Sequence, residues 1–281
     1  MVAPAILRTV RAVSLDVDGT ISGDDHAVAP RTAAAVTRIV ELGLPVFLLT
    51  GRARANTLGL ARDLRIPNIV TSDNGAVLLD PVRGEDVAVR PMAREHVRSL
   101  VELAAELDLD ITWWTTEAIY VEHEGAAADL LRRLNGDLVE VGDTQDLPEK
   151  VTKVMLFGTR EQLDDAADTI RSRFPDATRS MDTFFEFVDD AATKWNALTE
   201  MLARHGVDPE HCLGMGDGGN DVEWLGRIGV PIAMGNARPE VKEVAVDETA
   251  TNVEHGVALV LEALADELTR TNEPDTATTD D

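Results

Sequence analysis

The amino-acid sequence predicts an α/β fold with a parallel β-sheet core and a smaller α/β insertion. First, short apolar runs rich in Val, Ile and Leu alternate with helical patterns before residue 81, as is typical of βαβ units. Second, this alternation changes character after residue 81 and returns after residue 186. Third, the apolar runs of the core end in polar or glycine residues, where open parallel sheets bind ligands. We therefore expect a core at residues 1–80 and 187–270 and an insertion at residues 81–186.

The elements of the core follow from the spacing of apolar residues. Continuous apolar runs predict buried strands, whereas apolar residues three or four positions apart predict helices that bury one face. Gly43 ends the first long helix, because glycine commonly stops a helix. The predicted core strands are 10–16, 45–50, 68–72, 211–215 and 230–234, and the predicted core helices are 30–42, 56–64, 195–205, 222–227 and 254–268.

The insertion has its own alternation of helices and strands. We expect it to form a smaller α/β domain. The acidic tail at residues 271–281 is too polar to bury a core, so it is predicted to be disordered. The predicted helices of the insertion are 93–107, 126–134 and 161–174, and its predicted strands are 111–115, 118–122, 151–157, 177–181 and 184–188.

The composition is strongly acidic. The 281 residues include 51 Asp and Glu but only 26 Lys and Arg, which gives a formal net charge of −25. Such a surface repels nucleic acids and anionic membranes. The apolar runs are too short to span a bilayer, and the first residues lack the apolar core of a secretory signal. We therefore expect a cytoplasmic protein with no nucleic-acid or membrane partner.

Lysine and cysteine are both scarce. High acidity with few lysines resembles the proteins of salt-loving archaea, in which dense counterions screen the repulsion among carboxylates. We therefore expect a halophilic protein from a haloarchaeon. The single cysteine, Cys212, lies in an apolar stretch and excludes an intrachain disulfide. The lysines are Lys150, Lys153, Lys194 and Lys242.

The stretch L-G-M-G-D-G-G-N-D raises two interpretations. Its three glycines fit G-x-G-x-x-G, the fingerprint of a loop that binds a dinucleotide pyrophosphate. However, Asp217 lies inside the pattern and Asp221 closes it. Two carboxylates would repel a pyrophosphate unless a cation lay between them. We therefore favour a metal-binding loop, in which the glycines turn the chain sharply off the strand: Gly214, Gly216 and Gly219.

Chemically useful side chains follow several of the predicted core strands. Because the carboxyl ends of parallel strands lie at one edge of a sheet, we expect these side chains to form one site. A Lys also precedes a predicted helix. The residues concerned are Asp16 and Asp18 before Gly-Thr, Thr50-Gly51-Arg52, Lys194, and Asp217, Asn220 and Asp221.

This order of motifs resembles the haloacid dehalogenase superfamily of phosphotransferases. The resemblance covers nearly the whole chain except the acidic tail. It implies a Rossmann-like parallel core and makes the insertion the α/β cap of the Cof-type branch. Further local matches to that branch are residues 73–76, 234–237 and 256–258.

The resemblance fits the chemistry of phosphoryl transfer, which needs in-line placement and neutralisation of spreading negative charge. The Asp16 carboxylate can attack phosphorus and form an aspartyl-phosphate. Mg²⁺ prefers oxygen ligands, and Asp16, Asp217 and Asp221 supply them. The resemblance adds that Asp18 binds the metal through its backbone carbonyl. Its side chain then protonates the leaving oxygen and later activates water.

Four further residues are predicted to bind phosphate. The Thr50 hydroxyl and the Gly51 N–H are expected to contact phosphate oxygens, and Asn220 is expected to donate to one. Lys194 lies at the start of a predicted helix, where the helix dipole disfavours a cation. A bound phosphate would explain a lysine at this position, because its negative charge attracts the ammonium group. Trp195 departs from the family pattern, which usually has glycine there, and it narrows the expected pocket.

The predicted function is that of a Mg²⁺-dependent phosphatase for a small phosphorylated metabolite, of the sugar phosphate or phosphoglycolate class, acting as a monomer or homodimer. A phosphomutase uses the same groups and stays open as an alternative. Receiver-like signalling domains share an acidic cluster, a Thr and a Lys, but they are shorter and lack a cap. The histidines show no metal-ligand spacing and are expected on the surface or in packing: His26, His96, His123, His205, His211 and His255.

Overall fold

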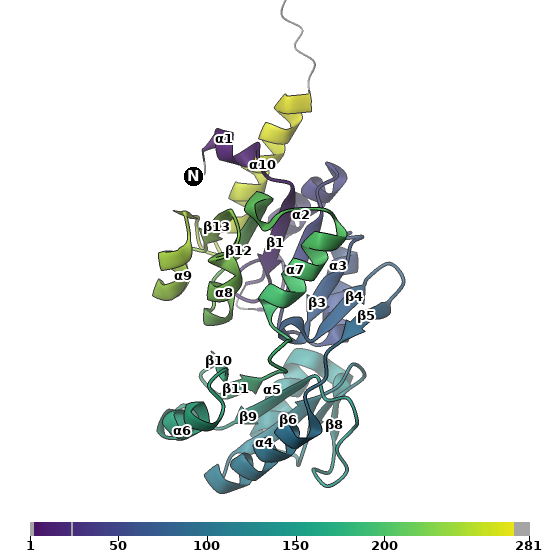
Figure 1. The fold of residues 1–281 in the computed structure, drawn as a ribbon, viewed down its shortest axis with the longest axis vertical. Helices are drawn as coiled ribbons and strands as arrows, with labels where there is room; N and C mark the ends of the chain where they lie inside the picture. The colour runs from purple at the N-terminus through teal and green to yellow at the C-terminus, as the bar shows by residue number, and fades with distance from the viewer. Residues whose placement is uncertain (1–2, 24, 273–281) are drawn as a thin grey trace, which may run out of the picture. The chain divides into compact units, whose positions relative to one another are not determined.

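The computed structural model describes residues 3–23 and 25–272 (Figure 1). This part of the chain divides into two compact units. Of the described residues, the first unit contains 3–23, 25–48, 64–66 and 202–272, and the second contains 49–63 and 67–201. Of the tail predicted to be disordered, residues 271 and 272 continue the last helix, and residues 273–281 lie outside the described residues.

The first unit is built on parallel strands, as predicted. Their order is β14-β13-β12-β1-β2, and β1 and β12 are buried at every position. Strands covered on both faces read as continuous apolar runs, which is why the sequence predicts β1, β2, β12 and β13 but not β14, which consists of two acidic residues. The strands are β1 (Ala12–Asp16), β2 (Val46–Leu49), β12 (Cys212–Gly216), β13 (Val230–Ala233) and β14 (Asp247–Glu248).

Helices complete the first unit. The helices α2 and α10 contact each other, and each buries an apolar face. No helix among the described residues is both long and apolar enough to cross a membrane. The helices are α1 (Pro4–Leu7), α2 (Pro30–Glu41), α8 (Val222–Leu225), α9 (Pro239–Val244) and α10 (Gly256–Asn272), with short 3₁₀ turns η3 (Pro209–His211) and η4 (Gly219–Asp221).

The second unit begins where β2 ends. Leu49 pairs with Thr71 in parallel, and β3, β4 and β5 then follow as antiparallel neighbours. The sequence analysis did not predict β4 and β5, and β5 lacks an apolar run. The elements here are α3 (Arg54–Asp63), β3 (Val70–Ser72), the 3₁₀ turn η1 (Asp73–Gly75), β4 (Val77–Asp80), β5 (Glu85–Val89) and α7 (Lys194–Arg204).

A six-stranded sheet forms the rest of the second unit, in the order β10-β11-β9-β6-β7-β8. Side chains of α4 and α6 share one apolar cluster with Trp113, and those of α5 share another with Trp114, because neighbouring strand residues point to opposite faces. The elements are α4 (Arg94–Leu107), β6 (Asp110–Trp114), β7 (Ile119–Val121), α5 (Ala126–Asn135), η2 (Gly136–Leu138), β8 (Val139–Val141), β9 (Lys153–Phe157), α6 (Arg160–Arg173), β10 (Thr178–Met181) and β11 (Phe184–Phe187).

Candidate active site

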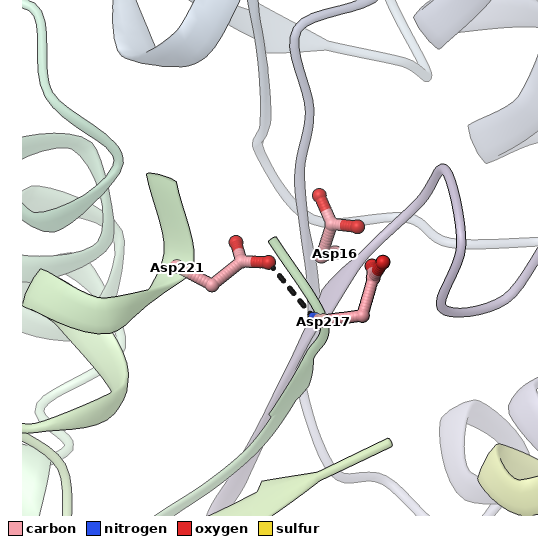
Figure 2. Close-up of side chains that lie close together, drawn as sticks. All are labelled: Asp16, Asp217 and Asp221. Atoms are coloured by element: carbon pink, nitrogen blue, oxygen red, sulfur yellow. Dashed lines mark hydrogen bonds between the residues drawn. The ribbon is translucent and has the colours of Figure 1, made fainter. Parts of the chain in front are cut away.

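Three aspartates gather at the carboxyl ends of β1 and β12 in the first unit. These strands pair in parallel with Leu15 opposite Met215, so Asp16 and Asp217 emerge at the same edge. Asp221 is the last residue of η4, one turn further on. One carboxylate oxygen of each residue lies within 4.8 Å of the others (Figure 2). Asp16 and Asp221 are buried, and Asp217 is half-buried.

Hydrogen bonds fix the orientation of the Asp221 carboxylate. Its Oδ2 accepts from the backbone N–H of Asp217 at 3.1 Å (Figure 2) and from that of Gly218 at 3.0 Å. Its Oδ1 accepts from the indole Nε1 of Trp224 at 2.9 Å. Trp224 is fully buried, so this donor is held in place by packing. Outer partners of this kind orient a metal ligand, although the sequence alone did not mark Trp224.

The Asp217 carboxylate is held by the loop that follows β1. Its Oδ1 accepts from the hydroxyl of Thr20 at 3.0 Å. Gly19 has a left-handed backbone with φ 84°, and a side chain there would overlap the Asp217 carboxylate. The Asn236 amide donates to the Gly19 carbonyl at 2.8 Å and ties the loop to the residues after β13. Asn236 lies in residues 234–237, which the sequence marks as a local match to the Cof-type branch, but no role was predicted for it.

The glycines of β12 make room for side chains; they do not turn the chain. Gly214 and Gly216 lie inside the strand, and neither has a positive φ. A Cβ on Gly216 would lie 2.7 Å from the Asp221 Cγ, and one on Gly214 would overlap the ring of Trp224. The expectation of a sharp turn is therefore wrong for these two positions, where close approach to Asp221 and Trp224 is the physical reason for glycine.

Asp18 and Asn220 lie beside this group. The Asp18 side chain is exposed and accepts from Ser22 Oγ at 3.4 Å, and its Oδ1 lies 3.1 Å from His26 Nδ1. It does not join the three gathered carboxylates. No pattern in the sequence indicates the contact with His26. Asn220 lies in η4, and its Oδ1 is 2.7 Å from the position of a Cβ on Gly218.

The gathered carboxylates fit a divalent metal ion. Three carboxylate oxygens this close repel one another unless a cation offsets their charge, and buried positions strengthen the repulsion. Hard oxygen donors are the ligands that Mg²⁺ and Ca²⁺ prefer. The side chains of Asp16, Asp217 and Asp221 can therefore hold a metal ion. The Asp18 carboxylate does not belong to this set of three.

The second unit contains the other predicted residues. Thr50 is buried directly after β2, and its hydroxyl oxygen accepts from the Arg52 N–H at 3.0 Å. Lys194 is the first residue of α7 and only 4% exposed, so it is not a solvated surface lysine. Gly75 has a φ of 107° and lies against the start of α7. A Cβ on Gly75 would be only 3.2 Å from the Lys194 backbone nitrogen.

Comparison with known proteins identifies the family. The family model of the haloacid dehalogenase-like hydrolases matches residues 13–261. The chain is 26% identical over 263 residues to the 5-amino-6-(5-phospho-D-ribitylamino)uracil phosphatase YitU of Bacillus subtilis, covering 89% of this chain and 95% of the relative. It is 27% identical over 241 residues to the HMP-PP phosphatase of Serratia proteamaculans, covering 83% and 87%. A solved haloacid dehalogenase-like hydrolase from Bacteroides thetaiotaomicron matches with a TM-score of 0.80 and 26% identity, over 90% of this chain and 98% of that one.

The fold and the gathered carboxylates, taken with these matches, define a hydrolytic enzyme with an α/β core. The chain belongs to the haloacid dehalogenase-like hydrolases, as the order of its motifs predicted. The two relatives named above are phosphatases, and membership of this family makes the chain a phosphoric monoester hydrolase. The dinucleotide interpretation of the glycine-rich loop is therefore wrong.

Proposed function

We propose that the protein is a Mg²⁺-dependent phosphatase that works through an aspartyl-phosphate intermediate. The observation that carries this proposal is the group of Asp16, Asp217 and Asp221 carboxylates, with oxygens within 4.8 Å of one another. A bound Mg²⁺ supplies positive charge that offsets the repulsion between an attacking carboxylate and a phosphate ester. Asp16 is the nucleophile in this proposal, because it is the buried residue that ends β1.

The two half-reactions use Asp16 and Asp18. A carboxylate oxygen of Asp16 attacks phosphorus, the bond from phosphorus to the ester oxygen breaks, and the Asp18 carboxyl gives its proton to the leaving alcohol. Asp18 then takes a proton from water as the water oxygen attacks the aspartyl-phosphate. Inorganic phosphate leaves and Asp16 is restored. The exposed Asp18 side chain, outside the carboxylate group, suits a residue that exchanges protons with reactants.

Thr50, Gly51, Lys194 and Asn220 bind the phosphoryl group in this proposal. The burial of Lys194 at the positive end of α7 supports its role, because a cation there gains from a bound anion. Thr50 already accepts a hydrogen bond from Arg52, and a hydroxyl that accepts one bond still has its own hydrogen to donate.

The proposed substrates are small phosphate esters of the sugar phosphate or phosphoglycolate class. A panel of such esters, extended by the compounds for which the two phosphatase relatives are named, is assayed for release of inorganic phosphate with and without Mg²⁺. Release without a bisphosphate activator is expected for a phosphatase. Transfer to a second oxygen of the same sugar would instead indicate a phosphomutase.

The variant Asp16→Asn tests the nucleophile. It is expected to lose turnover by roughly 1,000-fold or more, because an amide cannot form the intermediate. The matched control is Asp266→Asn, which removes an exposed carboxylate from α10 in the same unit. Circular dichroism confirms folding of both variants. Wild-type turnover by folded Asp16→Asn contradicts the proposal.

A further inference from the structure

The loop at residues 50–52 is held through all three of its backbone carbonyl groups. The donors are buried groups of the same unit, and two of them are backbone N–H groups of the turn η1. The third donor is a lysine side chain from the six-stranded sheet, 102 positions away in the sequence. Thr50 O accepts from Asn74 N at 2.9 Å, Gly51 O from Lys153 Nζ at 2.7 Å, and Arg52 O from Asp73 N at 3.1 Å.

Lys153 is itself enclosed. Its side chain is 1% exposed, and its Nζ lies 3.5 Å from Glu186 Oε2 and 3.6 Å from the centre of the Trp114 ring. A buried ammonium group is costly unless a carboxylate, a carbonyl or an aromatic face compensates it. Here all three do so, and they fix the direction in which Lys153 reaches the Gly51 carbonyl.

Glu186 also fixes the opposite side of the loop. Its Oε2 accepts from the Asn74 side-chain amide at 2.7 Å, and the Asn74 Oδ1 lies 2.9 Å from the position of a Cβ on Gly51. Glu186 therefore links two residues that contact Gly51. Lys153 binds the Gly51 carbonyl oxygen, and Asn74 lies beside the Gly51 Cα. Any residue larger than glycine at position 51 would displace the Asn74 amide.

One peptide unit connects Lys153 to the Thr50 hydroxyl. The Gly51 carbonyl and the Arg52 N–H belong to the same planar amide, so fixing one fixes the other. That N–H donates to Thr50 Oγ1 at 3.0 Å. A cation on the carbonyl polarises the amide, which makes its N–H a stronger donor, and the Thr50 hydroxyl a stronger donor in turn.

We propose that Lys153 is a positioning residue for phosphate binding: through the Gly51–Arg52 peptide it orients and polarises the Thr50 hydroxyl. The inference rests on the proposed function, in which Thr50 donates to a phosphoryl oxygen. Lys153, a residue of the six-stranded sheet, then influences how the Thr50 hydroxyl binds phosphate. The proposal requires the charge of Lys153 as well as its length, because polarisation depends on the cation.

The first test compares Lys153→Met with Lys150→Met, which removes an exposed lysine three residues earlier. The probe is inorganic phosphate with Mg²⁺, titrated by calorimetry, alongside hydrolysis of p-nitrophenyl phosphate. For Lys153→Met we expect phosphate affinity and kcat/KM to fall by roughly 10- to 100-fold, as for a misplaced binding group. We also expect the NMR signals of the Gly51 and Arg52 amides to shift. Lys150→Met is expected to match wild type.

A second variant separates positioning from loss of an ion pair. Lys153→Met leaves Glu186 buried without its cation, which can impair folding by itself. The double variant Lys153→Met/Glu186→Gln removes both charges, and Lys153→Arg keeps a cation and a donor. We expect the double variant to bind phosphate as weakly as the single variant, and the arginine variant to recover part of the affinity. Wild-type phosphate affinity in the folded double variant would falsify the inference.

The outcomes also separate this inference from the proposed function. If wild type hydrolyses p-nitrophenyl phosphate and the double variant does so equally well, the inference alone fails. If wild type neither binds phosphate nor hydrolyses the ester in Mg²⁺, the proposed function fails and the inference fails with it. Unchanged Gly51 and Arg52 amide signals in Lys153→Met overturn the hydrogen-bond chain in either case.

Discussion

At the scale of single residues, the folded protein disfavours the charged form of the Asp73 carboxyl group. Its side chain is fully buried in the turn η1, with a positive φ of 49°. Burial raises the pKa of Asp73 to about 6, and Glu186 and Asp86 raise it as well. Lys153 and the hydrogen bond from Thr152 at 2.9 Å lower this pKa but do not cancel the effect of burial.

This pKa predicts how stability depends on pH. Between about pH 4 and pH 6, the unfolded chain has lost the Asp73 proton while the folded protein keeps it, so ionisation favours unfolding as the pH rises. Removing the group with Asp73→Asn should therefore stabilise the protein relative to wild type by a margin that grows to about 3 kcal/mol near pH 6. Urea unfolding of both proteins at pH 4, 5, 6 and 7 measures the margin. A difference that does not change with pH contradicts the prediction.

Residues with a direct chemical function could be predicted from the sequence, whereas residues that act by contacting another residue could not. Asp16, Asp217 and Asp221 were predictable because a carboxylate after a buried strand has a direct chemical meaning. Lys153 and Trp224 carry no such mark. Their roles depend on partners that only the fold brings close, such as the Gly51 carbonyl for Lys153.

At the scale of elements, β12 shows how a strand can be shaped for the residues that follow it. Gly216 leaves space that the Asp221 carboxyl group fills. A Cβ on residue 216 would lie 2.7 Å from the Asp221 Cγ. The strand itself was predicted within a residue at each end, because its apolar run is buried on both faces. Its glycines were misread as turn residues, since the same sequence pattern serves close approach and tight turns alike.

The variant Gly216→Ala tests this use of glycine. We expect the added methyl group to displace Asp221, so that the apparent affinity for Mg²⁺ falls by about 10-fold or more. The measurement is the Mg²⁺ dependence of both phosphatase activity and the thermal midpoint. The control is Gly59→Ala in α3, because a Cβ at position 59 would meet nothing within 4 Å. This substitution should stabilise the helix by about 0.5–1 kcal/mol. Wild-type Mg²⁺ dependence in Gly216→Ala would show that Asp221 does not set metal affinity.

Short and antiparallel elements limited the prediction of the fold. The hairpin of β4 and β5 and the three-residue strand β8 were missed, whereas the long helices α4 and α6 were found. A helix of fourteen residues repeats its apolar spacing several times, which makes it readable in a single sequence. A strand of three or four residues shows its periodicity only once, so strands this short are found where a continuous apolar run marks them, as in β2 and β13, and β5 and β8 lack such a run.

At the scale of the whole molecule, net charge sets the balance between attraction and repulsion. Surface ion pairs such as Arg31–Glu262 and Arg173–Glu106 are exposed, and each contributes little. Against them stands an excess of 25 negative charges. Since the excess acts over the entire surface while each pair acts locally, we expect repulsion to dominate at low ionic strength.

Salt should therefore stabilise the protein. Raising NaCl from 0.1 M to 1 M shortens the Debye length from about 10 Å to about 3 Å, which screens repulsion between carboxylates on neighbouring elements. We expect the free energy of unfolding and the thermal midpoint to rise steadily over this range, despite the weakening of exposed ion pairs. Sucrose is the control, because it favours compact states without screening charge. A midpoint that is constant or falls as NaCl increases contradicts the halophilic interpretation. A rise with NaCl at pH 7 that disappears near pH 4.5, where the net charge approaches zero, would identify charge repulsion as its cause.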